Sequence, residues 1–454
     1  MEPMHDRKEN LAPAITAAGT PAASGAALDW VLDTTVDESC KAWPPHLGPR
    51  RLRDIGSLGL NLYRGDLPAP VAVLREEALA ANEEWMRLFL ASTGARLCPH
   101  GKTTMAPLLF ARQIERGAWG ITVATRHQLG IARRTGVRKI ILANEPVAAS
   151  DMQWIATELD RTPDLELYTY VDSVRLVESW SALRRRRPGQ PISLLLEVGF
   201  MDGRTGAREL TEAIAVAEAV HAAPDLRLAG IAGFEGIIRG DAQMSAVDRV
   251  RLFLDFMVEA ARECERRGLF EAEPVILSAG GSAYYDLVAE IFGRAGLRAP
   301  SAVILRSGCY LTHDHQMYQK FVDDLISRSP ASAKFPIRPR PALEVWTMVQ
   351  SRPQPDLMIC AMGKRDVGSD VDLPKPIAWC RPNRDREAAA LSDCAVVALN
   401  DQHAIVRVPP NCQLEVGDLV GFGVSHPCTT FDRWPLLYVI GKDGSVLGGI
   451  STFF

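Results

Sequence analysis

The chain has 454 residues, enough for two or three domains with buried cores. Its 51 Lys and Arg against 55 Asp and Glu give a formal net charge of -4, which argues against a nucleic-acid-binding surface. No run approaches the roughly 20 apolar residues of a membrane span, and the nine cysteines show neither a CxxC spacing nor a regular framework. We therefore expect a reduced, cytoplasmic protein whose partner is a small molecule, not nucleic acid or a membrane.

The N-terminal part of the chain differs in composition from the rest. Residues 1–28 are rich in Ala, Gly, Pro and charge without an apolar period, and we expect a disordered tail. From residue 71 the chain alternates short β-branched runs with amphipathic helical stretches. The predicted strands are 95–97, 120–124, 139–142, 166–171, 193–198, 228–232, 274–277 and 302–305, and the predicted helices include 76–91, 174–185 and 245–267.

This alternation predicts an α/β fold. Eight units over roughly 240 residues match a (β/α)₈ TIM-type barrel better than the main alternative, an open doubly wound sheet. We place the barrel in residues 71–328. After it the helical period fades and β-rich runs dominate, which predicts a C-terminal all-β domain in residues 329–454, joined by the segment 29–70. Its predicted strands are 343–350, 394–399, 403–408, 418–423 and 436–440.

Lys102 follows the first predicted strand, in the segment His100-Gly-Lys-Thr, where the active-site face of a barrel lies. A lysine there is more often a plain surface residue, so the assignment needs further evidence. Glycine-rich turns follow the seventh and eighth strands, in Ser278-Ala-Gly-Gly-Ser and Arg306-Ser-Gly-Cys-Tyr, and their backbone N–H groups can close on an anion. Together the segments suggest a phosphate cup facing a lysine.

Two further segments carry candidate chemistry. Arg204 lies in the tight loop Asp-Gly-Arg-Thr-Gly near the fifth strand end and can pair with a phenolate or carboxylate, although a surface arginine is the plain alternative. His426 and Cys428 stand two apart, so an extended turn would put both on one side, able to share a Zn²⁺. An HxC pair alone is a weak signal, the alternative being a core histidine and a buried cysteine.

The chain thus carries, in this order, a lysine segment, an arginine loop, glycine-rich turns and a His-x-Cys pair. In this it resembles the D-serine dehydratase-like family, a group of fold-type III pyridoxal-phosphate enzymes that also includes the D-threonine aldolases. The resemblance implies an alanine racemase-like barrel in which Lys102 binds pyridoxal 5′-phosphate covalently and Arg204 holds its phenolic oxygen. It implies that His426 and Cys428 bind Zn²⁺ or another divalent metal. Phe234 stands where relatives often present a tyrosine, so a ring can stack on the cofactor but no phenol is available. The other implied cofactor-binding residues are Ser278, Gly280, Gly281, Ser282, Ser307, Gly308, Cys309 and Tyr310.

The resemblance implies a lyase that eliminates the β-hydroxyl of D-serine or a related 3-hydroxy-D-amino acid, giving a 2-keto acid and ammonia. The alternative is a metal-dependent D-threonine or 3-hydroxy-D-amino acid aldolase, which releases glycine and an aldehyde. Cys428 favours elimination, because a carboxylate commonly takes this position in the aldolase branch. An amino-acid racemase or a non-catalytic pyridoxal-phosphate-binding protein would leave the metal pair unexplained. The resemblance also implies a homodimer, and we expect the segment 362–372 to contribute substrate contacts.

Overall fold

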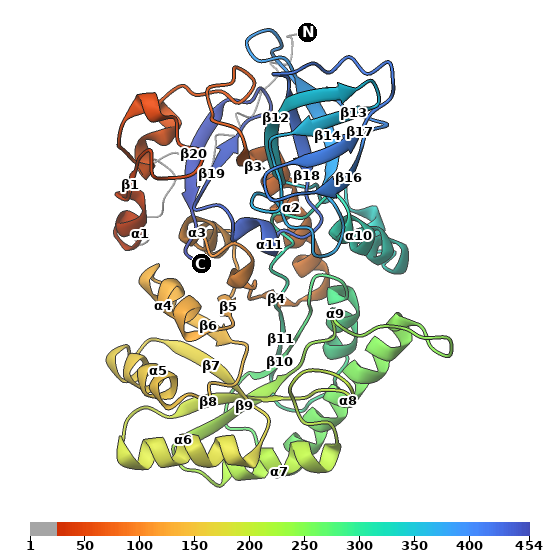
Figure 1. Cartoon of the computed structure of the whole chain (residues 1–454). Coiled ribbons are helices and arrows are strands. Elements are labelled where there is room, and N and C mark those ends of the chain that lie inside the picture. The colour runs from red at the N-terminus through yellow and green to blue at the C-terminus, as the bar shows by residue number, and fades with distance from the viewer. Residues whose placement is uncertain (1–24) are drawn as a thin grey trace, which may run out of the picture.

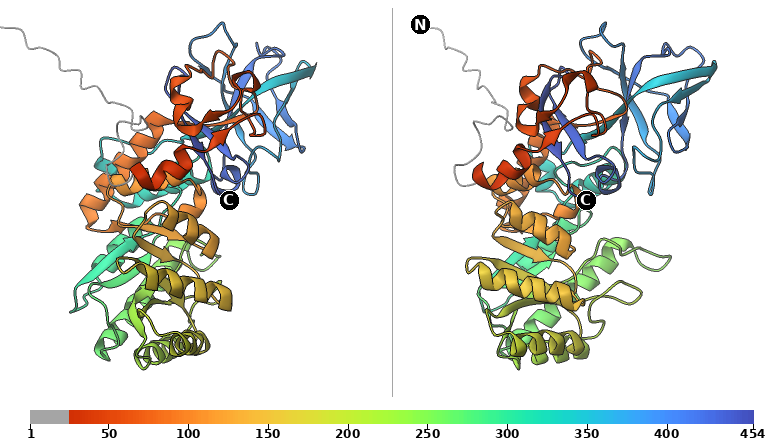
Figure 2. Two further views of the ribbon diagram at one scale, coloured as in Figure 1. Left: turned by 90° about the vertical axis from the view of Figure 1, so that its left-hand side faces the viewer. Right: turned by 60° about the vertical axis from the view of Figure 1, so that its left-hand side comes forward.

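The computed structural model describes residues 25–454 and shows two lobes, an α/β barrel and a β domain (Figures 1 and 2). Of the expected tail, residues 1–24 lie outside the described part. From Gly25 the chain forms helix α1 (Gly25–Leu32), in which Leu28 and Val31 are buried. The folded chain therefore begins earlier than the composition suggested.

The barrel sheet has eight parallel strands in the order β4-β11-β10-β9-β8-β7-β6-β5. Its two edges meet, because His100 and Thr122 form a parallel bridge and the Trp119 N–H donates to the Leu97 carbonyl at 2.6 Å. An open doubly wound sheet would leave those edges apart, so the barrel prediction is confirmed. The strands are β4 (Arg96–Leu97), β5 (Ile121–Val123), β6 (Lys139–Leu142), β7 (Glu166–Val171), β8 (Ile192–Glu197), β9 (Leu226–Ala232), β10 (Val275–Ala279) and β11 (Ser301–Leu305).

Helices pack around the outside of the barrel, and local signals set several of their ends. Thr125 and Ser245 cap α4 and α8 by accepting the backbone N–H of the third residue that follows. Gly94 ends α2 in the left-handed conformation, with φ of 71°. The helices are α2 (Glu76–Thr93), α3 (Pro107–Glu115), α4 (Arg126–Arg134), α5 (Ala149–Arg161), α6 (Val174–Arg186), α7 (Leu210–His221), α8 (Ala246–Arg266), α9 (Tyr285–Gly293) and α10 (Met317–Arg328).

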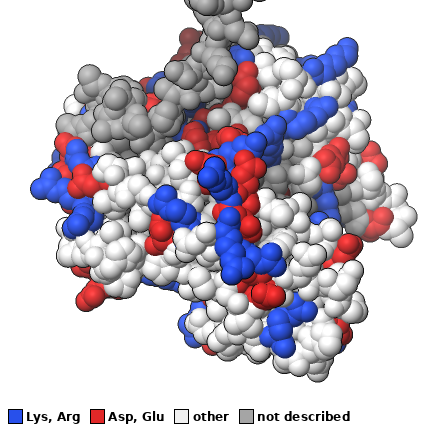
Figure 3. Space-filling model, turned by 90° about the horizontal axis from the view of Figure 1, so that it is seen from above, with Lys and Arg blue, Asp and Glu red and all other residues white. Residues whose placement is uncertain are grey.

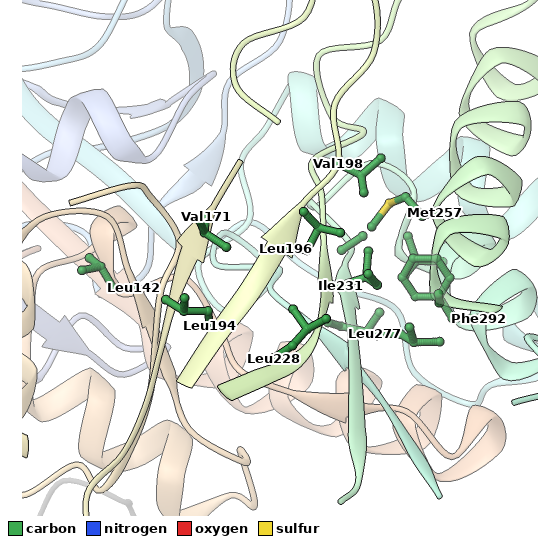
Figure 4. Close-up of a cluster of buried hydrophobic side chains, with 14 of the residues drawn as sticks. Leu142, Val171, Leu194, Leu196, Val198, Leu228, Ile231, Met257, Leu277 and Phe292 are labelled. Carbon is green, nitrogen blue, oxygen red and sulfur yellow. The ribbon is translucent and has the colours of Figure 1, made fainter. Parts of the chain in front are cut away.

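Successive side chains of the barrel strands point outward and inward in turn, so the barrel has two separate hydrophobic cores. Leu194 and Leu196 of β8 point outward and pack in the cluster that includes Met257 and Phe292 of the helices (Figure 4). Leu195, between them, belongs to the separate cluster inside the barrel. Side chains that continue this inward series at the carboxyl ends of the strands therefore lie at the barrel mouth.

The β domain is built around β12, which pairs antiparallel with β3, β13 and β18. Strand β3 also pairs in parallel with β19, so Val71–Arg75 lies in this sheet, although we expected the barrel to begin at residue 71. The segment before it packs on the same sheet, since Leu52 and Ile55 belong to the same hydrophobic cluster as Tyr438. The strands are β3 (Val71–Arg75), β12 (Leu343–Gln354), β13 (Leu357–Cys360), β14 (Lys375–Cys380), β15 (Ala389–Ala390), β16 (Ala395–Leu399), β17 (Ala404–Arg407), β18 (Leu419–Gly423), β19 (Leu436–Ile440) and β20 (Val446–Ser451).

The surface carries charges of both signs. Seen from above, basic and acidic side chains stand next to one another over the visible face, in keeping with the net charge of -4 (Figure 3). Within residues 25–454, no helix combines the length and the apolar character needed to cross a bilayer.

Candidate active site

Lys102 lies at the mouth of the barrel, in the short helical turn η3 (Gly101–Thr103) that follows β4. The turn packs closely on α3, because a Cβ on Gly101 would come 2.7 Å from the ring of Phe110. The Lys102 side chain is exposed, and among the described residues it forms no ion pair. The lysine is therefore held by its backbone while its amine remains available.

Three cations gather around His100, two residues before this lysine. Burial, and after it the charges of Lys102, Arg306 and Arg204, hold the pKa of the His100 imidazole well below its usual value. Its Nδ1 is buried and has no hydrogen-bond partner in the described chain. A neutral imidazole among three cations makes this end of the barrel a binding place for an anion.

Arg306 is buried at the end of β11 and is held by neutral groups. Its guanidinium donates to Ser278 Oγ at 2.6 Å and to the Gly233 carbonyl. The Ser278 hydroxyl in turn donates to the Ile304 carbonyl, so it supports Arg306 and does not face a ligand. In the sequence Arg306 is only the first residue of a glycine-containing turn, and no local pattern shows that its charge is buried.

The turn after β10 is occupied by a carboxylate of the protein itself. Glu235 accepts the N–H of Gly281 at 2.7 Å and that of Gly280 at 3.1 Å. Glu235 is fully buried, and this burial raises the pKa of its carboxyl group. The Ser307 hydroxyl braces the same turn by donating to both glycine carbonyls. Gly280 and Gly281 therefore form an internal brace instead of presenting free amides to a phosphate.

Three other backbone amides agree better with the predicted phosphate site than those of Gly280 and Gly281. These are the backbone N–H groups of Ser282, Gly308 and Cys309. Within residues 25–454, none of them donates to a backbone carbonyl in the turns, loops and caps. The turn after β11 reaches the lysine segment only because position 308 is glycine, since a Cβ there would come 2.4 Å from the His100 carbonyl oxygen. Free amides, nearby cations and an available lysine amine fit the phosphate and aldehyde of pyridoxal phosphate.

Arg204 and Phe234 lie together, and Tyr310 lies apart from them. The Arg204 guanidinium carbon is 4.8 Å from the centre of the Phe234 ring. The Arg204 loop is tied to the barrel by the Gly206 N–H, which donates to Asp172 at 3.3 Å. Tyr310 instead lines a cavity between α2 and α3 together with Gln113. Its ring therefore lies away from the Arg204 and Phe234 pair.

His426 and Cys428 come from the β domain and meet the barrel at its mouth. Cys428 begins the short helix α11 (Cys428–Phe431), and its Sγ lies 3.4 Å from Thr103 Oγ1 and 3.6 Å from Cys309 Sγ. Hydrogen bonds from Cys309 and His426 hold the pKa of the Cys428 thiol well below its usual value. The predicted metal pair thus lies beside the residue that follows Lys102.

Asp370 completes this pair, and the sequence alone did not single it out. Its Oδ2 lies 2.6 Å from His426 Nδ1, and its Oδ1 accepts the Thr429 hydroxyl at 2.6 Å. The Cys428 thiolate, and after it Asp370, raise the pKa of His426 to about 9. With Nδ1 held by a carboxylate, Nε2 remains for a metal, and imidazole with thiolate is a donor set that suits zinc. The residues present therefore fit the expected metal.

A second unpredicted feature is a triad of carboxylates inside the mouth. The acidic oxygens of Glu145, Asp172 and Glu197 lie within 4.8 Å of one another, and none forms an ion pair in the described chain. Burial, with Glu197 next, raises the pKa of Glu145 to about 9. The signal was present in the strands, because Asp172 and Glu197 continue the inward series of Tyr170 and Leu195.

Comparison with known proteins agrees with this geometry. Residues 74–289 match the alanine racemase N-terminal domain, and residues 342–440 match the putative serine dehydratase domain. The two domains occur here in one chain, as the sequence resemblance implied. Both matches agree with the resemblance to the D-serine dehydratase-like and D-threonine aldolase family. The chain is accordingly a lyase, and its alanine racemase-like fold implies pyridoxal phosphate as cofactor.

Relatives in this family extend over nearly the whole chain. The D-threonine aldolase of Arthrobacter sp is 25% identical over 391 residues, covering 86% of this chain and 92% of the relative. The 3-hydroxy-D-aspartate aldolase of Paracoccus denitrificans is 23% identical, covering 85% and 92%. Among solved structures, D-threonine aldolase from Filomicrobium marinum aligns with a TM-score of 0.70 at 20% identity, covering 87% of this chain and 97% of that one. D-threo-3-hydroxyaspartate dehydratase from Delftia sp. HT23 aligns with a TM-score of 0.64 at 19% identity, covering 85% and 98%.

Proposed function

We propose that the chain is a pyridoxal-phosphate- and zinc-dependent dehydratase that eliminates the β-hydroxyl of D-serine or a related 3-hydroxy-D-amino acid, giving a 2-keto acid and ammonia. The observation that carries this proposal is the position of the metal pair. Cys428 Sγ lies 3.4 Å from Thr103 Oγ1, and Thr103 follows Lys102 directly. A metal held there would stand beside the lysine segment that holds the cofactor.

The choice of zinc rests on the donor atoms. A thiolate and an imidazole suit Zn²⁺ better than Mg²⁺, which prefers oxygen ligands. Structures of D-threo-3-hydroxyaspartate dehydratase include variants in which a histidine or a cysteine two positions further along is replaced by alanine, and the cysteine variant is described as a metal-free form. His426 and Cys428 have the same spacing, which supports a metal-dependent dehydratase.

The residues divide the work between binding and proton transfer. Pyridoxal phosphate, when bound, supplies the electron sink for charge that develops at Cα. The free amides of Ser282, Gly308 and Cys309 would hold its phosphate, and the Lys102 amine would attach it and later take the Cα proton. His426 and Cys428 would hold zinc, whose Lewis acidity makes the β-hydroxyl a better leaving group.

A second candidate is retro-aldol cleavage of a 3-hydroxy-D-amino acid. It is favoured by the names of both curated relatives, D-threonine aldolase and 3-hydroxy-D-aspartate aldolase. The two reactions use the same lysine and metal. They differ in whether the hydroxyl leaves or loses its proton, so the products separate them.

The test measures both products in one series. The pyridoxal-phosphate-loaded protein is incubated with D-serine and with D-threonine, with and without a chelator, and keto acid and aldehyde are assayed separately. Keto acid that the chelator abolishes and added zinc restores is the expected result. Aldehyde with glycine would replace the dehydratase with the aldolase. Cofactor absorbance that persists unchanged in Lys102→Ala, with Lys139→Ala as control, would contradict both.

We also propose that the enzyme works as a homodimer in the cytoplasm. Family resemblance supports the dimer, since barrels of this fold type commonly complete their active sites with residues of a neighbouring subunit. Light scattering on the cofactor-loaded protein at several concentrations should give twice the chain mass. A monomer with full activity would contradict the proposal.

A further inference from the structure

Cys309 faces the metal pair as well as the phosphate cup. We expected this residue to bind phosphate, and among the described residues its backbone N–H has no backbone acceptor in a turn or loop. Its side chain, however, points across the boundary between the two domains. The Cys309 Sγ lies 3.6 Å from Cys428 Sγ and 3.5 Å from Thr103 Oγ1, and the residue is 3% exposed. A buried thiol placed among polar groups is not simply filling an apolar core.

The separation of the two sulfurs is the one that a shared metal requires. Two thiolates bound to a tetrahedral zinc at about 2.3 Å each lie roughly 3.8 Å apart. The observed 3.6 Å is close to this value and far above the roughly 2.05 Å of a disulfide. The sulfurs need no rearrangement to bind one ion.

We propose that Cys309 is a third protein ligand of the metal, an inference that rests on the zinc site of the proposed function. As the zinc–sulfur bond forms, the thiol proton passes to solvent. The site then has two ligands from the β domain and one from the barrel. Three protein ligands with one position left for substrate is the composition of a catalytic zinc site.

One side chain must move for this site to form. Among the described residues, the ligand atoms of His426, Cys428 and Cys309 do not all lie within 4.8 Å of one another. Cys428 contacts Cys309 through its Sγ and stands two residues after His426 in the same segment. Metal binding therefore draws the His426 imidazole toward Cys309 while Asp370 keeps hold of Nδ1. The metal would tie the β domain to the barrel mouth.

X-ray absorption at the zinc edge counts the sulfur neighbours directly. The zinc- and cofactor-loaded wild type should show two sulfurs per zinc at about 2.3 Å. Cys309→Ser should show one, and its zinc Kd should rise at least about tenfold, because even an outer-shell change costs that much. Cys40→Ser, a half-buried cysteine of the N-terminal segment, is the matched control and should keep two sulfurs.

The outcomes separate this inference from the one on which it rests. One sulfur per zinc in the wild type, unchanged in Cys309→Ser and lost in Cys428→Ser, would overturn the third ligand and leave the proposed function standing. No sulfur in the wild type would overturn both. The sulfur count of the wild type is sufficient by itself, so the inference can be tested even if the Cys309 variant folds poorly.

Discussion

His426 Nδ1 lies 2.6 Å from Asp370 Oδ2, and this contact joins two loops of the β domain that are 56 residues apart. The carboxylate fixes which imidazole nitrogen carries the proton and which one faces the barrel mouth. Asp370 is itself held by the Thr429 hydroxyl, so the histidine is oriented by a chain of contacts from α11. The segment 362–372, from which we expected substrate contacts, supplies this support to the metal pair.

Asp370→Asn should weaken metal binding by about tenfold or more without unfolding the protein. The amide can still accept from Nδ1, but it no longer raises the basicity of the imidazole. Zinc affinity measured by competition with a chromophoric chelator tests this. Asp393→Asn, at an exposed loop position, is the control and should leave zinc affinity unchanged. Equal affinities in the two variants would rule out the orienting role of Asp370.

Glu235→Gln should lower the free energy of unfolding by about 1–3 kcal/mol. The buried carboxylate accepts two backbone N–H groups, and the glutamine side chain would turn its NH₂ toward one of them. Urea denaturation followed by fluorescence measures the loss. Glu209→Gln, an exposed residue, should change stability by less than about 0.5 kcal/mol. A Glu235 variant as stable as the wild type would show that the brace is dispensable.

The carboxylate triad should make stability depend on pH. Burial and Glu197 raise the pKa of Glu145 from an ordinary value of 4.5 to about 9, so the folded protein keeps a proton that the unfolded chain loses. The free energy of unfolding should therefore fall as pH rises from about 5 to 9, by at most about 1.4 kcal/mol per unit for this group. Denaturation curves of wild type and Glu145→Gln across that range test it. The amide cannot titrate, so a slope that is the same in both proteins would exclude Glu145 as its source.

Gly308→Ala should impair cofactor retention and lower the melting temperature. The added Cβ would come 2.4 Å from the His100 carbonyl, so either the phosphate turn or the lysine segment must move. Gly293→Ala is the matched control, because nothing lies within 4 Å of its Cβ. Cofactor absorbance after dialysis, together with thermal denaturation, measures the effect. Full cofactor retention in Gly308→Ala would show that the close approach of the two segments is not needed.

Much of the fold was readable from the sequence. The eight barrel strands were predicted to within a few residues, because short apolar, β-branched runs between amphipathic helices are distinctive. Strand β3 was assigned to the wrong domain, since its four buried apolar residues read the same in either sheet. Only its pairing with β12 and β19 places it, and such pairing depends on residues far away in the chain.

For the site, the sequence by itself determined which groups are available: a lysine after the first barrel strand, glycine-rich turns after the last two, and a histidine two residues before a cysteine. Tertiary structure alone decided what those groups contact. Glu235 occupies the amides of Gly280 and Gly281, and Cys309 meets Cys428 across 119 residues of chain. The physical reason is that local periodicity fixes the face on which a side chain lies, whereas its partner is set by how the barrel and β domain pack together.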